Sequence, residues 1–464
     1  MRTKASRRRA ISIFAAVSAT AIILAGCSGG ADPSQSGEGD SITMWTFKQP
    51  HLAALQAAAE TFKEETGITV DVQAVTPDDA FTTKVQASAQ SGDLPDVLEV
   101  HSDGEDRVLG GSGVLVDLGP LLGAGISDAF IPSIADSGIV TAEQAERATS
   151  EGASDAGIVE GARYGIPFTI GTFGIIYANK EKLAAVGITE APTTWEEFTA
   201  GAAATSEADP ANGGISLGFQ AISIGLNWIG NQLGFAQLGE AGFGDLYGDD
   251  TASDWGSASG KEVLDLYSQL DGKWMPGTQT LTIDDADLAF LQGKAAWAVG
   301  GTFTLGFLNQ NGMDLDNVIA FPLPAPENGA VDDLKLAPIA LTSLAITKDA
   351  KNTDAAAQWL EYLASPEVAT QFAIDATDLP ATDLGPEAAE VLGQNLATLT
   401  AVFEGTPEQT FDVGTIWDYT PPSMSNFDDL GAVVAKLSPL EEVSVDEAAA
   451  QMQAILQNLW ASAE

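Results

Sequence analysis

The sequence predicts an α/β fold built on parallel strands, in a chain large enough for two lobes. Ser41–Phe47 alternates apolar and polar residues as a strand does, and Ile68–Val72 has the pattern of a second strand, with a helical pattern between them. Such a strand–helix–strand unit joins two parallel strands through a right-handed crossover. The chain has 464 residues, more than one domain usually holds.

Local signals bound the helix between these two strands. Pro50 suits the first turn, apolar residues recur at helical spacing from Leu52 to Phe62, and Gly67 ends the helix. The α/β pattern continues along the chain. Helices are predicted over 80–91, 261–270 and 354–363, a strand over 96–100, and helix starts at the capping boxes Thr194–Glu197 and Ser444–Glu447.

The first 26 residues have the pattern of a secretory signal peptide. Basic residues between Arg2 and Arg9 precede an apolar run over 10–25, and the run ends in Leu-Ala-Gly before Cys27. This ending resembles a bacterial lipobox, which implies cleavage before Cys27 and a lipid on its sulfur. Residues 28–39 hold no large apolar side chain, so 27–40 is predicted to be a lipidated, flexible tether.

The charge balance excludes several classes of partner. The formal net charge is −45, from 65 acidic and 20 basic residues spread along the chain. Nucleic-acid binding needs a basic surface, so no nucleic-acid partner is expected. Direct adhesion to anionic lipid is disfavoured for the same reason. Cys27 is the only cysteine, so no intrachain disulfide is expected and packing must stabilise the fold.

Motifs for catalysis, metal binding and phosphate binding are absent from the sequence. The chain has two histidines, His51 and His101, and contains no HExxH, CxxC, GxSxG or P-loop pattern. Carboxylates are plentiful, but nothing singles out one pair for acid–base chemistry. We therefore expect no metal, no cofactor and no enzymatic activity.

Tryptophan is frequent, and an aromatic ring can stack on the apolar face of a sugar. Most of the nine tryptophans lie in predicted strands or helices and are expected in the core. The better candidates for a binding surface sit in glycine- or proline-rich surroundings: Trp228, Trp274 and Trp417.

The order of several segments carries a family resemblance from Ser41 to the C-terminus. These segments are Ile42–Trp45, Phe62–Gly67, Ser91–Val97, Gly113–Leu118, Tyr164–Phe168, Ile176–Lys180, Thr193–Phe198, Phe290–Ala296, Gly300–Phe303, Leu341–Ile346 and Leu379–Ala381. In this order they resemble the extracellular solute-binding proteins of carbohydrate ABC importers, the class that includes maltose-binding protein.

The resemblance implies the two-lobed periplasmic-binding-protein fold of type II, with the ligand in a cleft between the lobes. It places hinge crossovers near Pro167, Ala340 and Gly385. The N-terminal lobe would combine residues 41–167 with 340–385, and the C-terminal lobe 168–339 with 386–464.

The resemblance also implies which residues contact the ligand, because ligands of open α/β sheets bind at loops that follow the strands. Carried over by position, the predicted contacts are Phe47, Gln49, His101, Asp103, Gly171, Trp228, Phe303, Thr342, Trp417 and Tyr419. Lys48-Gln-Pro50 stands where maltodextrin binders have a Gly-Asp-Lys turn, so a mono- or oligosaccharide other than maltose is expected.

The function expected from the resemblance is capture of a sugar by a monomer anchored through Cys27 to the outer face of the bacterial membrane, for delivery to an ABC permease. Three alternatives stay open from the sequence. One is the same fold binding a polyamine, peptide or metal chelate, another is a cell-wall enzyme acting on glycans, and the third is a surface sensor or adhesin.

Overall fold

The computed structural model describes residues 41–102, 104–150, 152–385, 387–421 and 423–463, all within the compact unit 39–464. The predicted leader, Cys27, the tether and the predicted contact Asp103 lie outside the described residues.

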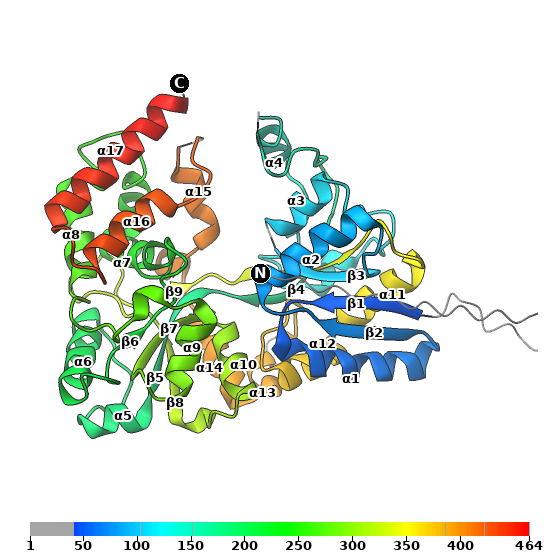
Figure 1. The fold of residues 1–464 in the computed structure, drawn as a ribbon, viewed down its shortest axis with the longest axis horizontal. Coiled ribbons are helices and arrows are strands. Elements are labelled where there is room, and N and C mark those ends of the chain that lie inside the picture. Colours follow the sequence, from blue (N-terminus) through cyan, green and yellow to red (C-terminus); the bar gives the residue numbers. More distant parts are fainter. Residues whose placement is uncertain (1–40, 103, 151, 386, 422, 464) are drawn as a thin grey trace, which may run out of the picture. The chain divides into compact units, whose positions relative to one another are not determined.

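The first sheet has five strands in the order β2–β1–β3–β10–β4 (Figure 1). Their bounds are β1 (Ser41–Thr46), β2 (Thr69–Ala74), β3 (Val97–His101), β4 (Ile166–Gly171) and β10 (Ile339–Ile346). Strand β1 runs parallel to β2 and β3, whereas β10 runs antiparallel to β3 and β4. The predicted parallel strand–helix–strand start is therefore confirmed.

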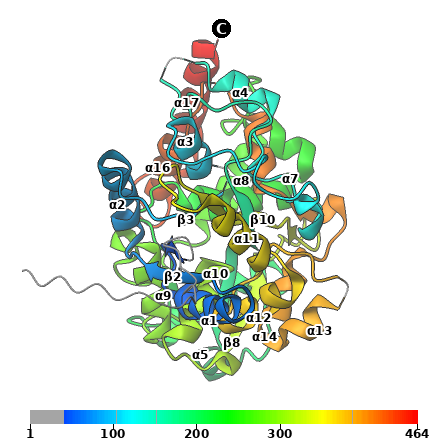
Figure 2. The ribbon, with the colours of Figure 1, turned by 90° about the vertical axis from the view of Figure 1, so that its right-hand side faces the viewer.

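Helices cover both faces of this sheet, as Figures 1 and 2 show. On one face lie α1 (Gln49–Thr66), α11 (Thr353–Leu363) and α12 (Pro366–Ala376); on the other lie α2 (Asp78–Ser91) and α3 (Glu105–Gly111). Helix α1 has Pro50 in its first turn and ends at Gly67, whose φ of +80° is left-handed, as predicted.

The second sheet has four strands in the order β6–β7–β5–β8. Their bounds are β5 (Phe173–Asn179), β6 (Ile215–Ser216), β7 (Trp297–Gly301) and β8 (Val318–Pro322). Strands β4 and β5 are separated only by Thr172, so the chain changes sheet at that residue. The segment after α12 returns to the first sheet, since the Ile170 N–H donates to the Leu379 carbonyl.

The remaining elements include α4, which lies beside α3 on the side of the first sheet, and others that lie around the second sheet (Figure 1). They are α4 (Ala142–Arg147), α5 (Lys180–Ala185), α6 (Trp195–Ala208), η2 (Leu226–Gly230), α7 (Asn231–Asp245), α8 (Ala258–Ser268), α9 (Ile283–Leu291), α10 (Phe303–Gln310), β9 (Lys335–Leu336), α13 (Ala388–Leu392), α14 (Gln394–Thr400), β11 (Thr410–Phe411), α15 (Ile416–Tyr419), α16 (Asp428–Leu437) and α17 (Val445–Ala463), with short 3-10 turns η1 (Ile126–Ala129), η3 (Thr278–Thr280), η4 (Leu315–Asn317), η5 (Ala401–Phe403), η6 (Pro407–Gln409) and η7 (Val413–Thr415).

One predicted helix cap is confirmed and the other is half right. The Ser444 hydroxyl accepts from the Glu447 N–H, and the Glu447 carboxylate accepts from the Ser444 N–H, which completes that box. The Thr194 hydroxyl accepts from the Glu197 N–H, but the Glu197 carboxylate accepts instead from the N–H of Thr193. The carboxylate thus reaches one residue further back than a capping box requires.

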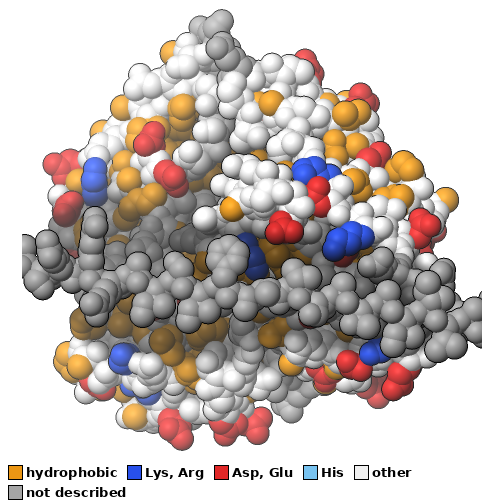
Figure 3. All heavy atoms as spheres, turned by 45° about the vertical axis from the view of Figure 1, so that its right-hand side comes forward, with side chains coloured by type: hydrophobic (Ala, Val, Ile, Leu, Met, Phe, Trp, Pro, Cys, Tyr) orange, Lys and Arg blue, Asp and Glu red, His pale blue; other side chains and the backbone are white. Residues whose placement is uncertain are grey.

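The expectation that most tryptophans belong to the core is confirmed. Trp195, Trp297 and Trp359 have no exposed surface, and the Trp297 indole donates to the Thr205 hydroxyl at 2.9 Å. Asp and Glu side chains, in contrast, are spread over the surface displayed in Figure 3, with Lys and Arg among them.

Candidate functional site

Three aromatic rings from separate elements meet beside the point where the chain changes sheet. Phe173 begins β5, Trp228 lies in η2, and Phe303 begins α10. The Phe173 and Trp228 rings are parallel within 5°, with centroids 5.3 Å apart. The Phe303 ring stands edge-on to both, at 6.4 and 6.3 Å. We call these three residues the aromatic cluster.

The sequence allows η2 to approach β5 this closely because residue 174 is a glycine. Gly174 has a φ of +78°, and a Cβ there would collide with the Gln232 side chain and the Trp228 carbonyl. The Gln232 amide donates to the Phe173 carbonyl at 2.7 Å, which fixes α7 against the start of β5. Its Oε1 atom is buried without a hydrogen-bond partner among the described residues.

Within the cluster, Phe173 and Phe303 offer the accessible surface. Trp228 is only 7% exposed, because Phe173 covers it, while Phe173 and Phe303 are half-buried. Trp228 therefore supports the ring of Phe173. The accessible ring that the sequence predicted to be Trp228 is Phe173 instead.

Lys48 reaches the aromatic cluster from the end of the first strand. Its Nζ atom lies 5.8 Å from the centroid of the Phe303 ring and 3.1 Å from Oδ2 of Asp378. The Lys48 side chain is 14% exposed and that of Asp378 is 3% exposed. A cation above an aromatic face is attracted by the ring quadrupole, so Lys48 and Phe303 hold one another in place.

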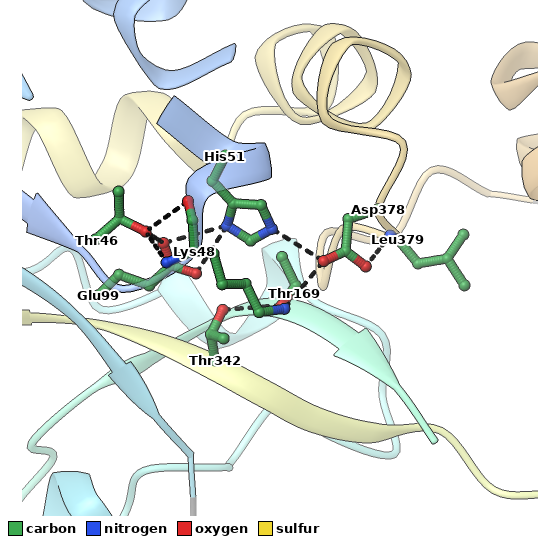
Figure 4. A network of polar contacts seen from close by, with 8 residues as sticks. All are labelled: Thr46, Lys48, His51, Glu99, Thr169, Thr342, Asp378 and Leu379. Carbon is green, nitrogen blue, oxygen red and sulfur yellow. Dashed lines mark hydrogen bonds and ion pairs between the residues drawn. The ribbon is translucent and has the colours of Figure 1, made fainter. Parts of the chain in front are cut away.

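A buried polar network continues from Asp378 into the first sheet (Figure 4). The His51 ring lies between two carboxylates, with Nε2 2.9 Å from Asp378 and Nδ1 2.9 Å from Glu99. Since ionised carboxylates only accept hydrogen bonds, a ring that serves both must carry both protons. The Thr46 hydroxyl donates to Glu99 at 2.6 Å and the Leu379 N–H donates to Asp378 at 2.9 Å.

The ionisation of this network follows from mutual pairing. Burial opposes the charged form of His51, but the charges and hydrogen bonds of Glu99 and Asp378 outweigh it and raise the His51 pKa. Burial likewise opposes charge on both acids. His51 nevertheless lowers the pKa of Glu99, and Lys48 together with His51 lowers the pKa of Asp378 to about 2.

A second group forms around two predicted contacts, Phe47 and His101. Their rings stack with centroids 4.2 Å apart, and Nδ1 of His101 lies 3.0 Å from the Glu105 carboxylate. Asp78 lies 3.5 Å from Nε2 of His101. Burial lowers the pKa of His101, but Glu105 and Asp78 outweigh it, so the pKa is raised.

A cavity of about 370 Å³ adjoins this second group between α2 and α3. Its lining residues are Thr82, Val85, Gln86, His101, Glu105, Val108 and Leu109. His101 therefore faces both the cavity and the Phe47 ring.

Two further predicted contacts lie inside the sheet structure. Thr342 is 1% exposed, pairs with His101 in the β10–β3 ladder, and shares a hydrogen bond of 2.8 Å with Thr169. Gly171 ends β4, and a Cβ there would meet the Thr302 hydroxyl and the Leu341 side chain. Their role as ligand contacts stays a prediction.

The last predicted contacts are held by other neighbours. Gln49 is exposed, and its carbonyl accepts from the Gln310 amide of α10 at 3.2 Å. Trp417, 39% exposed, packs on Phe427 at 4.8 Å. Tyr419 lies edge-on to Phe243, and its hydroxyl lies 3.4 Å from Glu240. Among the described residues, neither Trp417 nor Tyr419 makes a ring contact with the aromatic cluster.

Trp274, named from its setting as a candidate for the binding surface, packs elsewhere. Its ring stands edge-on to Phe219 at 5.0 Å, and its indole donates to the Ser438 hydroxyl at 2.8 Å. These contacts give Trp274 a structural role.

Sequence reasoning missed five residues of the site. Phe173 looks like any strand residue, and Lys48 had a signal only in its place after the first strand. The other three, His51, Glu99 and Asp378, carry no local pattern that joins them.

In the described part of the chain, no group of three or more His, Cys, Asp or Glu side chains is arranged to hold a metal ion. Across the same residues, no helix has both the length and the apolar character needed to cross a bilayer.

Residues 48–370 match the family model described as bacterial extracellular solute-binding protein. The chain is 25% identical over 303 residues to the putative ABC transporter periplasmic-binding protein YcjN of Escherichia coli K12, covering 65% of this chain and 62% of that protein. It is 24% identical over 377 residues to the maltodextrin-binding protein MdxE of Bacillus subtilis 168, covering 79% of each. The chain thus spans less than two thirds of the length of YcjN.

A solved structure from Caldanaerobius polysaccharolyticus, determined in a study of xylan utilization, is similar to this fold with a TM-score of 0.67. The two sequences are 20% identical, and the match covers 89% of this chain and 99% of the other. This likeness confirms the predicted two-lobed α/β fold class.

Proposed function

We propose a function from the premise that this chain belongs to the bacterial extracellular solute-binding protein family. It is the substrate-binding component of an ABC importer, which captures a mono- or oligosaccharide outside the membrane and delivers it to a permease. The description of YcjN supports the transporter role. The maltodextrin named for MdxE and the xylan study of the similar structure support a sugar as the solute.

The observation that carries the proposal is the aromatic cluster with Lys48 beside it. The half-buried rings of Phe173 and Phe303 offer apolar surface suited to the C–H face of a sugar ring. Lys48 supplies N–H donors next to that surface, 5.8 Å from the Phe303 centroid. Apolar walls with a few convergent polar groups are typical of small-molecule sites.

The solute contacts that we propose combine the sequence prediction with the geometry. They are Phe47, Gln49, His101, Asp103, Gly171, Phe303, Thr342, Trp417 and Tyr419, with Lys48 and Phe173 added from the structure. The predicted contact Trp228 acts through the Phe173 ring that it supports. The lobes we propose are 41–167 with 340–385 and 168–339 with 386–464. A solute that contacts both lobes favours the closed form through its greater affinity for that form.

The chain acts without changing its solute, as a monomer anchored to the outer face of the bacterial membrane. The Leu-Ala-Gly sequence directly before Cys27 supports a lipid anchor. Replacement of this residue, Cys27→Ala, should release the protein into the medium of a bacterial host, while wild type sediments with membranes. Wild-type protein found wholly in the medium would argue against the anchor.

Ligand binding is tested with the full chain by thermal shift and isothermal titration. The panel holds glucose, galactose, xylotriose and maltotriose, with spermidine and a tripeptide as non-sugar probes. A probe at a hundred times its Kd stabilises the fold by about 2.7 kcal/mol, a shift of several degrees. A shift with a sugar supports the proposal. A shift with spermidine or the tripeptide alone would overturn the sugar assignment.

A further inference from the structure

The position of Lys48 makes it the cation that a bound sugar would meet first. The residue lies two positions after the end of β1, and its Nζ atom lies 5.8 Å from the centroid of the Phe303 ring of the aromatic cluster. The described residues give the Nζ atom one hydrogen-bond acceptor, Oδ2 of Asp378. An ammonium has three donors, so two of them are left for a solute, and the Lys48 side chain is 14% exposed.

The charge of this ammonium is balanced by the buried network behind it. Lys48 and His51 carry the positive charges, and Glu99 and Asp378 carry the negative ones. Asp378 contacts both cations, and Figure 4 shows it between the Lys48 ammonium and the His51 ring. Lys48 therefore offers hydrogen-bond donors without an excess of positive charge.

The wider surroundings are acidic. His101 stacks on Phe47, the residue before Lys48, and is flanked by the carboxylates of Asp78 and Glu105 at 3.5 and 3.0 Å. A solute carboxylate that approached Lys48 would meet Asp378, which contacts the same ammonium at 3.1 Å. Like charges at such distances repel, and partial burial weakens the screening by water.

We propose that Lys48 is a specificity-determining residue that selects a neutral sugar, and that Asp378 is the positioning residue that cancels its charge and so excludes uronic acids. This inference rests on the proposed function. A neutral hydroxyl accepts a hydrogen bond from Lys48 at no electrostatic cost. A uronate carboxylate would form a stronger, charge-assisted hydrogen bond, but it would have to share an ammonium that already bonds Asp378 at 3.1 Å, and the two carboxylates would repel one another.

The variant that separates charge cancellation from packing is Asp378→Asn. The amide keeps the size of the side chain, and its oxygen can still accept from the Leu379 N–H. Its NH2 group would then take the place of the Oδ2 atom that accepts from Lys48 and His51, so Lys48 loses its counter-charge. The ratio of the uronate Kd to the neutral-sugar Kd should then fall at least tenfold. A merely structural role for Asp378 would weaken both ligands alike and leave that ratio unchanged.

Lys48 is tested by Lys48→Met and Lys48→Arg, so the outcome does not depend on the folding of the Asp378 variant. The methionine should weaken neutral-sugar binding at least tenfold, and the arginine should restore most of it. Lys84→Met is the matched control. Lys84 also lies over an aromatic ring, with Nζ 3.8 Å from the Trp45 centroid, but it is not among the proposed solute contacts.

The probes are pairs that differ by one carboxylate: glucose with glucuronate, galactose with galacturonate, and xylotriose with its 4-O-methylglucuronosyl derivative. Affinities are measured on the full chain by isothermal titration. We expect wild type to bind a neutral member at least tenfold more tightly than its acidic partner. If Lys48→Met binds as wild type does, or the acidic members bind equally well, the inference is wrong while the proposed function stands. If wild type binds no sugar, both are wrong.

Discussion

Phe173 stacks on Trp228, with ring planes 5° apart. Phe173 thereby covers Trp228, which is only 7% exposed. The two residues are far apart in the chain, yet Gln232, in the helix that follows Trp228, binds the Phe173 carbonyl. A solute can reach the ring of Phe173. The ring of Trp228 fixes the position of Phe173.

The first prediction separates the roles of these two rings. Phe173→Ala should weaken sugar binding at least tenfold, because it removes the accessible ring, and should lower the melting temperature only modestly. Trp228→Ala should cost about 3–5 kcal/mol of folding free energy, because it empties a buried site. Isothermal titration and thermal melts measure the two effects. Trp460→Phe, on α17, is the control. Equal loss of binding in that control would contradict the assignment.

The second prediction concerns the glycine beneath the cluster. Gly174→Ala should destabilise the fold by more than about 1 kcal/mol, because its φ of +78° disfavours a side chain and its Cβ would strike Gln232 and Trp228. Gly187→Ala is a matched control, since Gly187 has a φ of +85° but no atom within 4 Å of its Cβ. The difference in melting temperature between the variants measures the collision. If Gly187→Ala lowers the melting temperature more than Gly174→Ala does, the collision at Gly174 does not destabilise the fold.

Much of the fold could be predicted from the sequence because its signals are local. Pro50 and Gly67 bound α1, and alternation identifies β1 and β2. Part of the site could also be predicted: Phe47 and His101 lie at strand ends and stack on one another, and the predicted contacts Trp228 and Phe303 both belong to the aromatic cluster.

The network behind the site could not be predicted, because its partners are distant in sequence. His51 and Asp378 are 327 positions apart, and neither carries a local pattern that points to the other. Phe173 was missed for a related reason, since its exposure depends on where η2 lies. These contacts come from tertiary packing, and no short segment of the sequence contains a pattern that predicts them.

The third prediction tests the confirmed capping box at α17. Ser444→Ala should destabilise the protein by about 1 kcal/mol, because the Glu447 N–H loses its acceptor. Ser462→Ala, near the other end of the same helix, removes an exposed hydroxyl that binds only a helix carbonyl and should change little. Thermal melts of both variants provide the measurement. Equal melting temperatures would show that the cap does not stabilise the helix.

The fourth prediction is the pH dependence of stability that the His51 network confers. The pKa of Asp378 is lower in the folded state, about 2, than its ordinary 3.8, so its contribution is complete above pH 3.8 and is lost as pH falls toward 2. The pKa of His51 is raised above its ordinary 6.5, so its contribution is complete below pH 6.5 and is lost as pH rises through the folded-state value. The pKa of Glu99 is lowered from its ordinary 4.5, so its contribution is complete above that pH, and the network stabilises most between about pH 4.5 and 6.5.

The His51→Gln variant isolates this effect. The amide side chain of this variant cannot titrate, so the excess stability of wild type over the variant should be greatest near about pH 5–6 and should shrink as the pH rises above about 6.5. Chemical denaturation across the range from acid to mildly alkaline pH gives the two curves. His101→Gln serves as the comparison, because His101 is 44% exposed and its charge is screened by water. If the wild-type and His51→Gln curves stay parallel over the whole range, His51 does not change its charge between the folded and unfolded states as the geometry requires.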